Sequence, residues 1–127
     1  NLGTAILKFA QCPIKNLIAQ TSLKQMLALL ANANIVLSPD TGPAHMAVSQ
    51  HTPVLGLYGH SNPKRTGPYL YQQYAAEVYH KNIQTQTGRN VKHLAWGTRV
   101  KGADIMKQIT VDHVIEKFDQ IVSDFKL

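Results

Sequence analysis

The feature that most constrains the fold is a continuous apolar run at residues 53–58, Pro-Val-Leu-Gly-Leu-Tyr. A strand with one wet face alternates apolar and polar residues, whereas an unbroken apolar run is expected of a strand covered on both faces, as in parallel sheets. Upstream, residues 35–37 form another short apolar run, a turn occupies residues 38–43, and residues 44–50 have a helical pattern. This order of strand, turn, helix and buried strand predicts a parallel α/β fold.

Towards the N-terminus, residues 4–11 have the pattern of the end of a helix, because Pro13 disfavours helical backbone before it. Residues 14–18 are predicted to form a short strand. Ser22 followed by Gln25 is a capping-box pattern, and the apolar residues after it recur at helical spacing up to residue 31. We therefore expect a helix there.

Towards the C-terminus, Gly, Pro and polar residues predict a long loop at 59–69, and residues 76–80 are predicted to form a strand. Residues 81–102 give no usable periodic signal. After Thr110, apolar residues follow one helical stripe, which predicts a terminal amphipathic helix. The expected fold is a Rossmann-like parallel sheet flanked by helices, in a single domain over residues 1–127.

Composition limits the class of protein further. With 44% hydrophobic and 16% charged residues, the chain can bury a core and is not disordered. Its one cysteine, Cys12, excludes an intrachain disulfide and favours a reducing compartment. No apolar run approaches the roughly 20 residues that span a bilayer. Residues 1–8 begin inside an apolar pattern without the features of a signal peptide, so we expect the chain to be part of a longer protein.

The net charge of +6 is concentrated in one stretch, which we call the basic window, residues 64–107. It holds two acidic and eight basic side chains, namely Lys64, Arg65, Lys81, Arg89, Lys92, Arg99, Lys101 and Lys107. Such a surface suits a phosphorylated small molecule, an anionic membrane or a nucleic acid, and it also occurs as a merely solvated surface. No zinc-finger spacing, aromatic RNA-binding strand or basic helix accompanies the charge, so we expect no nucleic-acid partner.

The turn after the first predicted strand carries the candidate binding residues, because ligands of parallel α/β folds bind at the carboxyl ends of strands. Gly42 permits close backbone approach or an unusual dihedral angle, and Pro43 suits the first turn of a helix. Free amides there, together with the Thr41 hydroxyl, could hold a diphosphate, and Asp40 could accept hydrogen bonds from sugar hydroxyls. The alternative is a plain helix start, in which Asp40 or Thr41 caps the helix and His45 packs under the turn.

Metal chemistry has little support in the sequence. The six histidines include no pair at His-x-x-x-His spacing, and no two acidic residues form an Asp-x-Asp motif that could hold a divalent metal on a diphosphate. We therefore expect no metal site.

Several ordered blocks carry a family resemblance. They are Leu37-Ser38-Pro39-Asp40-Thr41-Gly42-Pro43-Ala44-His45-Met46-Ala47, then Thr52-Pro53-Val54, Leu57-Tyr58-Gly59 and the loop block at 62–69, flanked by residues 16–23 and by Ile109-Thr110-Val111 with Val114. Together they resemble glycosyltransferase family 9, the lipopolysaccharide heptosyltransferases, over roughly residues 16–122. Two departures are Ala19 and Gln20, which stand where the family usually has Gly and Lys, so a phosphate role at that position is in doubt.

The resemblance implies a two-domain GT-B architecture, of which this chain would be most of the C-terminal, donor-binding domain. It implies that Asp40 contacts the sugar of a nucleotide-activated donor, typically ADP-heptose, and that Thr41 and Gly42 contact its diphosphate. His45 would brace the loop and is, with Pro43, a weaker candidate for donor binding. Independently of the resemblance, the basic window makes Lys64 and Arg65 candidates for contacting phosphate or forming part of the basic face. The N-terminal acceptor domain, with the catalytic base, would lie outside the chain, which alone should not catalyse transfer.

The implied reaction is metal-independent transfer of heptose to the lipopolysaccharide inner core, without a cofactor. The acceptor would be a phosphorylated glycolipid, and the enzyme would be cytoplasmic, with peripheral contact to the inner membrane. The alternative is a non-catalytic nucleotide-binding or interaction module of the same fold. A preceding Rossmann-like domain with a carboxylate facing the cleft is required by the first hypothesis and not by the second.

Overall fold

A three-stranded parallel sheet forms the centre of the molecule in the computed structural model, which describes residues 2–127. The strands β1 (Val36–Pro39), β2 (Val54–Tyr58) and β3 (Ala76–Glu77) lie in that order across the sheet. Val36 pairs with Val54, and Leu57 pairs with Ala76. The middle strand, β2, is the unbroken apolar run, so the prediction of a parallel α/β fold is confirmed.

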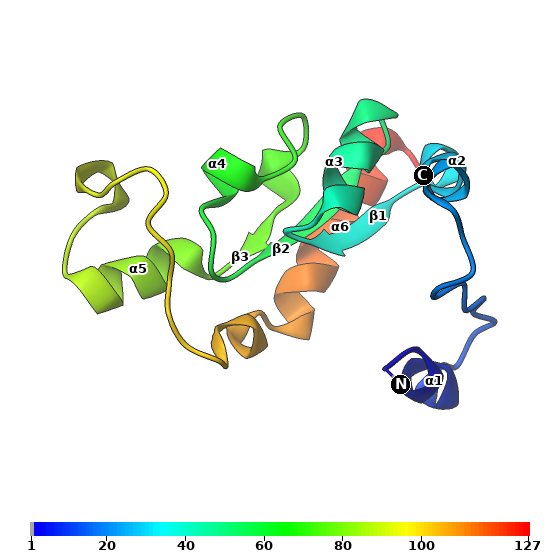
Figure 1. Cartoon of the computed structure of the whole chain (residues 1–127), viewed down its shortest axis with the longest axis horizontal. Coiled ribbons are helices and arrows are strands. Elements are labelled where there is room, and N and C mark those ends of the chain that lie inside the picture. The colour runs from blue at the N-terminus through cyan, green and yellow to red at the C-terminus, as the bar shows by residue number, and fades with distance from the viewer. Residues whose placement is uncertain (1) are drawn as a thin grey trace.

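Helices cover the sheet on both sides (Figure 1). Helix α3 (Gly42–Ser49) joins β1 to β2 and packs against both, while α2 (Leu23–Asn32) packs against α3. Helix α6 (Val111–Phe125) packs against β2 and β3 from the opposite side. The core between these layers consists of Leu30, Val36, Ala44, Ala47, Val54, Leu55, Tyr71, Tyr74, Ala76 and Ile121.

Local sequence signals explain where the predicted helices begin. The Ser22 hydroxyl accepts a hydrogen bond from the Gln25 backbone N–H at 3.3 Å, and the Gln25 side chain accepts one from the Ser22 N–H at 2.8 Å. This reciprocal capping box starts α2 as predicted. At α6, the Thr110 hydroxyl accepts from the His113 N–H at 3.2 Å. Both helices therefore begin where an N-terminal side chain satisfies a free amide.

The predicted strand at residues 14–18 is wrong, because these residues form no strand and pair with no neighbour in the described chain. Their polar groups make local bonds instead. The Asn16 side chain accepts from the Ile18 N–H at 3.0 Å, and the Gln20 side chain donates to the Asn16 carbonyl at 3.2 Å. Ala19 follows with a φ of 59°, which breaks any extended run.

The stretches 59–69 and 76–80 differ from prediction because in each a side chain accepts a hydrogen bond from a backbone N–H at the start of a helix. Helix α4 (Pro63–Thr66) lies within the predicted loop, and the Asn62 side chain accepts from the Lys64 N–H at its start. Strand β3 ends at Glu77, whose carboxylate accepts hydrogen bonds from the backbone and ring of His80. The chain therefore turns from strand into helix α5 (Tyr79–Thr87) two residues after Glu77.

Residues 81–102, which show no periodicity, hold most of α5 and the 3₁₀ turn η2 (Val91–His93). A further 3₁₀ turn, η3 (Ile105–Gln108), precedes α6, and η1 (Gln72–Tyr74) precedes β3. A second small core, made of Tyr79, Ile83, Val100 and Ile105, packs α5 against the segment at Val100 and against η3.

The first 20 described residues form an extension that we call the N-terminal arm, residues 2–21. It contains α1 (Leu2–Phe9), predicted at residues 4–11, which Figure 1 shows apart from the sheet at the end of an extended linker. Within α1 only Gly3 is buried, while Leu2 and Phe9 are 76% and 79% exposed. Among residues 2–127, no helix combines the length and the apolar character needed to cross a membrane.

Candidate functional site

The turn between β1 and α3 places Asp40, Thr41 and Gly42 at the carboxyl end of the sheet, as the sequence predicts. Thr41 occupies the N-cap position with extended backbone, yet its side chain makes no capping bond to the helix. Its hydroxyl lies 3.0 Å from the Ser38 hydroxyl and donates to the Pro39 carbonyl at 3.3 Å. No side chain therefore caps α3. The Ala44 N–H donates to the Thr41 carbonyl at 3.1 Å and Pro43 has no N–H, so Gly42 carries the amide of the first turn for which no partner is recorded among residues 2–127.

The Asp40 carboxylate is held by the hydroxyls of two residues that follow β2 in the chain. Ser61 donates to Oδ2 of Asp40, and Thr66 donates to the same oxygen at 3.0 Å. Ser61 is buried, with 4% of its surface exposed, whereas Asp40 is half-buried. Both recorded bonds go to Oδ2, so the carboxylate has a fixed orientation and keeps lone pairs on Oδ1 for another donor.

Tyr58, the last residue of β2, lies beneath this cluster. Its hydroxyl donates to the Thr66 carbonyl at 3.4 Å, which ties α4 to the sheet. Burial, and to a smaller extent the charge of Asp40, raise the pKa of Tyr58 from its ordinary 10 to about 12. The phenol is therefore neutral at physiological pH and serves as a hydrogen-bond donor.

Asp40 opens onto a cavity of about 240 Å³, which we call the Asp40 cavity. It lies where the carboxyl ends of β1 and β2 meet, the usual ligand position of parallel α/β folds. The lining combines a carboxylate, a guanidinium, an imidazole and apolar side chains, supplied by Pro39, Asp40, Leu57, Gly59, His60, Ser61, Arg99 and Met106.

Gly42 stands at the start of α3 with open space around it. A Cβ built on Gly42 meets no atom within 4 Å, and its φ is not positive. The sequence offers two reasons for a glycine here. The expectation of an unusual dihedral angle is wrong, and the open space leaves room for a ligand to approach the backbone closely. Pro43 is half-buried in the first helical turn.

The remaining predicted residues lie away from the Asp40 cavity. His45 is exposed on α3, and no hydrogen bond from its side chain is recorded in the described chain, so it does not brace the loop through such a bond. Lys64 and Arg65 are exposed on α4. Lys64 lines a separate cavity of about 360 Å³ with His80 and Lys117, and the Arg65 guanidinium lies against Gly97.

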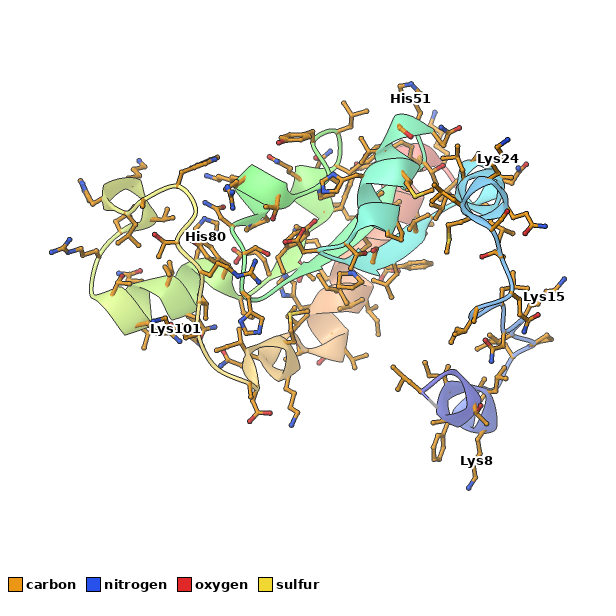
Figure 2. All side chains as sticks on the ribbon, viewed as in Figure 1. Lys8, Lys15, Lys24, His51, His80 and Lys101 are labelled. Atoms are coloured by element: carbon orange, nitrogen blue, oxygen red, sulfur yellow. The ribbon has the colours of Figure 1, made fainter. Side chains whose placement is uncertain are left out.

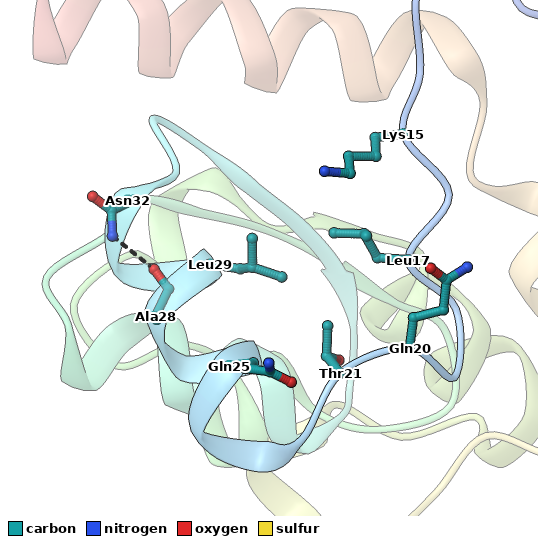
Figure 3. A pocket seen from close by; sticks show the side chains of 8 residues that line it. All are labelled: Lys15, Leu17, Gln20, Thr21, Gln25, Ala28, Leu29 and Asn32. Atoms are coloured by element: carbon teal, nitrogen blue, oxygen red, sulfur yellow. Dashed lines mark hydrogen bonds between the residues drawn. The ribbon is translucent and has the colours of Figure 1, made fainter.

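A third cavity, of about 440 Å³, lies between α2 and the linker of the N-terminal arm (Figure 3). It is lined by Lys15, Leu17, Gln20, Thr21, Gln25, Ala28, Leu29 and Asn32. Gln20, which replaces the lysine of the family pattern, therefore has no contact with the Asp40 cavity, since the two linings share no residue.

The sequence does not place three residues at this site: Ser61, Thr66, which it gives only as part of the loop block, and Arg99, which it gives only as part of the basic window. The first two reach Asp40 from positions 21 and 26 residues further along the chain. Arg99 lies in the stretch without periodicity. No local pattern marks such partners, because the folded sheet alone brings them together. Among residues 2–127, no group of three or more His, Cys, Asp or Glu side chains is arranged to hold a metal ion.

The fold and the site together define a class: a parallel α/β chain with a carboxylate and a helix N-terminus at the carboxyl edge of its sheet. Residues 4–96 match glycosyltransferase family 9, described as heptosyltransferases. The chain belongs to this family.

Curated relatives agree with this assignment. The chain is 42% identical to the lipopolysaccharide core heptosyltransferase OpsX of Haemophilus influenzae over 106 residues, which are 84% of this chain and 30% of that protein. It is 36% identical to lipooligosaccharide heptosyltransferase 2 of the same organism, over 42% of this chain and 15% of that protein. For lipopolysaccharide heptosyltransferase 2 of Salmonella typhimurium the identity is 31%, over 53% of this chain and 20% of the relative.

The chain thus spans less than a third of the length of each of these relatives. No solved structure matches it.

Proposed function

We propose that this chain binds the nucleotide-activated sugar donor of a GT-B heptosyltransferase that extends the lipopolysaccharide inner core, with ADP-heptose as the donor. The observation that carries this proposal is the Asp40 carboxylate, held by Ser61 and Thr66 beside the uncapped N-terminus of α3. Family membership and the names of the relatives support the sugar class.

Each residue of the turn has a role in this proposal. Oδ1 of Asp40 accepts a hydrogen bond from a hydroxyl of the donor sugar. The diphosphate lies against the Gly42 N–H at the start of α3, where the open space at Gly42 admits it and the helix dipole favours negative charge. The Thr41 hydroxyl, at the mouth of the same turn, donates to a phosphate oxygen once it turns away from the Pro39 carbonyl.

Transfer leaves a nucleoside diphosphate with one more negative charge on its terminal phosphate. The Gly42 N–H, the dipole of α3 and nearby basic side chains stabilise that charge in the transition state, so the proposed reaction needs neither a metal nor a cofactor. The base that activates the acceptor hydroxyl is supplied from outside residues 1–127. Heptose transfer is then a property of the complete enzyme, to which this chain contributes donor binding.

Calorimetric titration of the full-length protein with ADP-heptose and with ADP tests the donor site. Asp40→Asn keeps an acceptor for Ser61 and removes the charge, and we expect it to weaken ADP-heptose about tenfold while sparing ADP. Gly42→Val fills the open space and should weaken both ligands. Ser61→Ala is the matched control, since it loosens the carboxylate without removing it and should have an intermediate effect.

The outcomes separate the two hypotheses. Binding of neither ligand by the wild-type protein would remove the donor assignment. Binding of ADP alone, with equal affinity in the wild-type protein and in Asp40→Asn, together with no transfer to any lipopolysaccharide acceptor, would favour a non-catalytic nucleotide-binding module of the same fold.

For the acceptor we propose a phosphorylated glycolipid, approached by a cytoplasmic enzyme that contacts the inner membrane peripherally through the basic window. Figure 2 shows Lys101 at the end of the molecule opposite Lys8, Lys15 and Lys24. Trp96, which is 62% exposed, lies in the same window and is a side chain suited to a membrane interface.

Co-sedimentation with vesicles tests this contact. We expect the protein to sediment with anionic vesicles at low salt and to be released as salt screens the charges. Neutral vesicles are the control. Equal binding to neutral and anionic vesicles would contradict the proposal, and it would leave the donor site untouched.

A further inference from the structure

Arg99 lies on a backbone segment that is anchored on both sides. The Tyr79 hydroxyl donates to the Thr98 carbonyl at 2.7 Å. The Val100 N–H donates to the His60 carbonyl at 2.9 Å, and Nδ1 of the His60 ring lies 2.9 Å from the Val100 carbonyl oxygen. Val100 itself is buried in the second core. Two hydrogen bonds to His60 and one to Tyr79 therefore hold the backbone of residues 98–100 in place.

The side chain between these anchors is an exposed arginine that lines the Asp40 cavity. Of the residues described around the cavity, Arg99 alone carries a permanent positive charge. The ion pairs recorded within residues 2–127 join Glu77 to His80 and Asp104 to Lys107, so neither Asp40 nor another carboxylate neutralises Arg99. An arginine on an anchored backbone segment, with no ion pair recorded for its guanidinium in residues 2–127, can receive an anion at the wall of this cavity.

We propose that Arg99 binds the diphosphate of the nucleotide-sugar donor at the wall of the Asp40 cavity. The inference rests on the proposed function and adds a residue to it. A guanidinium at the wall of the cavity supplies a permanent positive charge for the anionic diphosphate. Its planar fork also matches two phosphate oxygens at once, which a lysine does not.

Two observations make this role specific to Arg99. The basic residues expected at this site from the sequence, Lys64 and Arg65, do not line the cavity, so they cannot replace it there. The assignment rests on the anchored segment of this chain, residues 98–100.

Calorimetric titration of the full-length protein with ADP and ADP-heptose tests the assignment. Both ligands carry the diphosphate, so we expect Arg99→Ala to weaken both by the same factor, about tenfold or more. Arg99→Lys keeps the charge without the fork and should lose less. Lys24→Ala removes one positive charge from exposed α2, away from the cavity, and should bind as the wild type does. Thermal unfolding of each variant checks that the fold is intact.

The pattern across variants distinguishes the two proposals. If the wild type binds both ligands and Asp40→Asn weakens ADP-heptose, but Arg99→Ala binds ADP as tightly as Lys24→Ala does, the role of Arg99 is overturned and the donor site stands. If Arg99→Ala weakens only ADP-heptose, Arg99 contacts the sugar and the diphosphate assignment is wrong. If the wild type binds neither ligand, both proposals fail together.

Discussion

The Asp40 cavity and the N-terminal arm differ in how their side chains are satisfied. At the cavity, a buried serine, a threonine and a buried tyrosine from separate elements converge on one carboxylate and its neighbours. In the arm, Leu2, Phe9 and Ile18 are mostly exposed, and the hydrogen bonds of its linker span at most four residues. The first region is held by long-range hydrogen bonds, while the hydrogen bonds recorded in the linker of the arm are local.

The two regions therefore differ in how firmly their side chains are held in place. A group fixed by several long-range partners keeps its geometry as long as the sheet is folded, as a binding site requires. A segment held by local hydrogen bonds can unfold locally at a small cost in free energy, and a substitution there has little effect on the unfolding of the rest of the protein. Substitutions in the two regions should therefore give different responses, and four predictions test this contrast.

The largest expected effect is at β2, on which the cavity is built. Leu55 is 1% exposed in the central strand, and Leu55→Ala should lower the free energy of unfolding by about 2–5 kcal/mol through lost packing and a cavity. Phe9→Ala in the arm should change it by less than about 0.5 kcal/mol. Chemical denaturation followed by circular dichroism measures both. Equal costs would show that the arm belongs to the same cooperative unit as the sheet.

The next effect concerns the carboxylate of the cavity. Asp40→Ala leaves the buried Ser61 hydroxyl without its acceptor and should cost about 1–3 kcal/mol of unfolding free energy. Asp40→Asn, which keeps an acceptor oxygen, should cost less. Asp104→Ala is the control, because the pair between Asp104 and Lys107 is largely exposed and should contribute little. A cost for Asp104→Ala as large as that for Asp40→Ala would contradict the contrast.

The same contrast explains how much the sequence could predict. Patterns contained within a few residues predicted correctly the capping box at Ser22, the buried strand β2 and the position of Asp40 after β1. The partners of Asp40 lie 21 and 26 residues away and belong to elements whose packing is set by the whole sheet, so no local signal marks them. The strand expected at residues 14–18 fails for the complementary reason, since a strand also needs a neighbour, which sequence periodicity does not reveal.

A smaller effect, confined to alkaline pH, concerns Tyr58. Its pKa is raised to about 12 in the folded protein, so the unfolded chain ionises first, near its ordinary value of 10. The stability linked to this phenol is complete below about pH 10 and is lost as the pH rises towards 12. Denaturation midpoints across this range should fall less steeply in Tyr58→Phe.

Burial also raises the pKa of Tyr71, Tyr74 and Tyr79, so Tyr58→Phe should reduce the alkaline slope without abolishing it. Tyr69→Phe, at a side chain that is 69% exposed, is the control. If the stability of Tyr58→Phe and of Tyr69→Phe falls with pH as steeply as that of the wild type, Tyr58 is not a source of this pH dependence.

The smallest effect compares two N-cap residues, one beside the arm and one at the cavity. Ser22→Ala removes a capping box and should cost about 1 kcal/mol of unfolding free energy. Thr41→Ala should cost less, since the Thr41 hydroxyl makes no capping bond and its contacts are to Ser38 and Pro39 within the turn. The same variant should weaken ADP binding in the full-length protein, because this hydroxyl is free to turn towards a phosphate. An unfolding cost at Thr41 equal to that at Ser22, with ADP binding unchanged, would make Thr41 a structural cap and restrict the binding turn to Asp40 and Gly42.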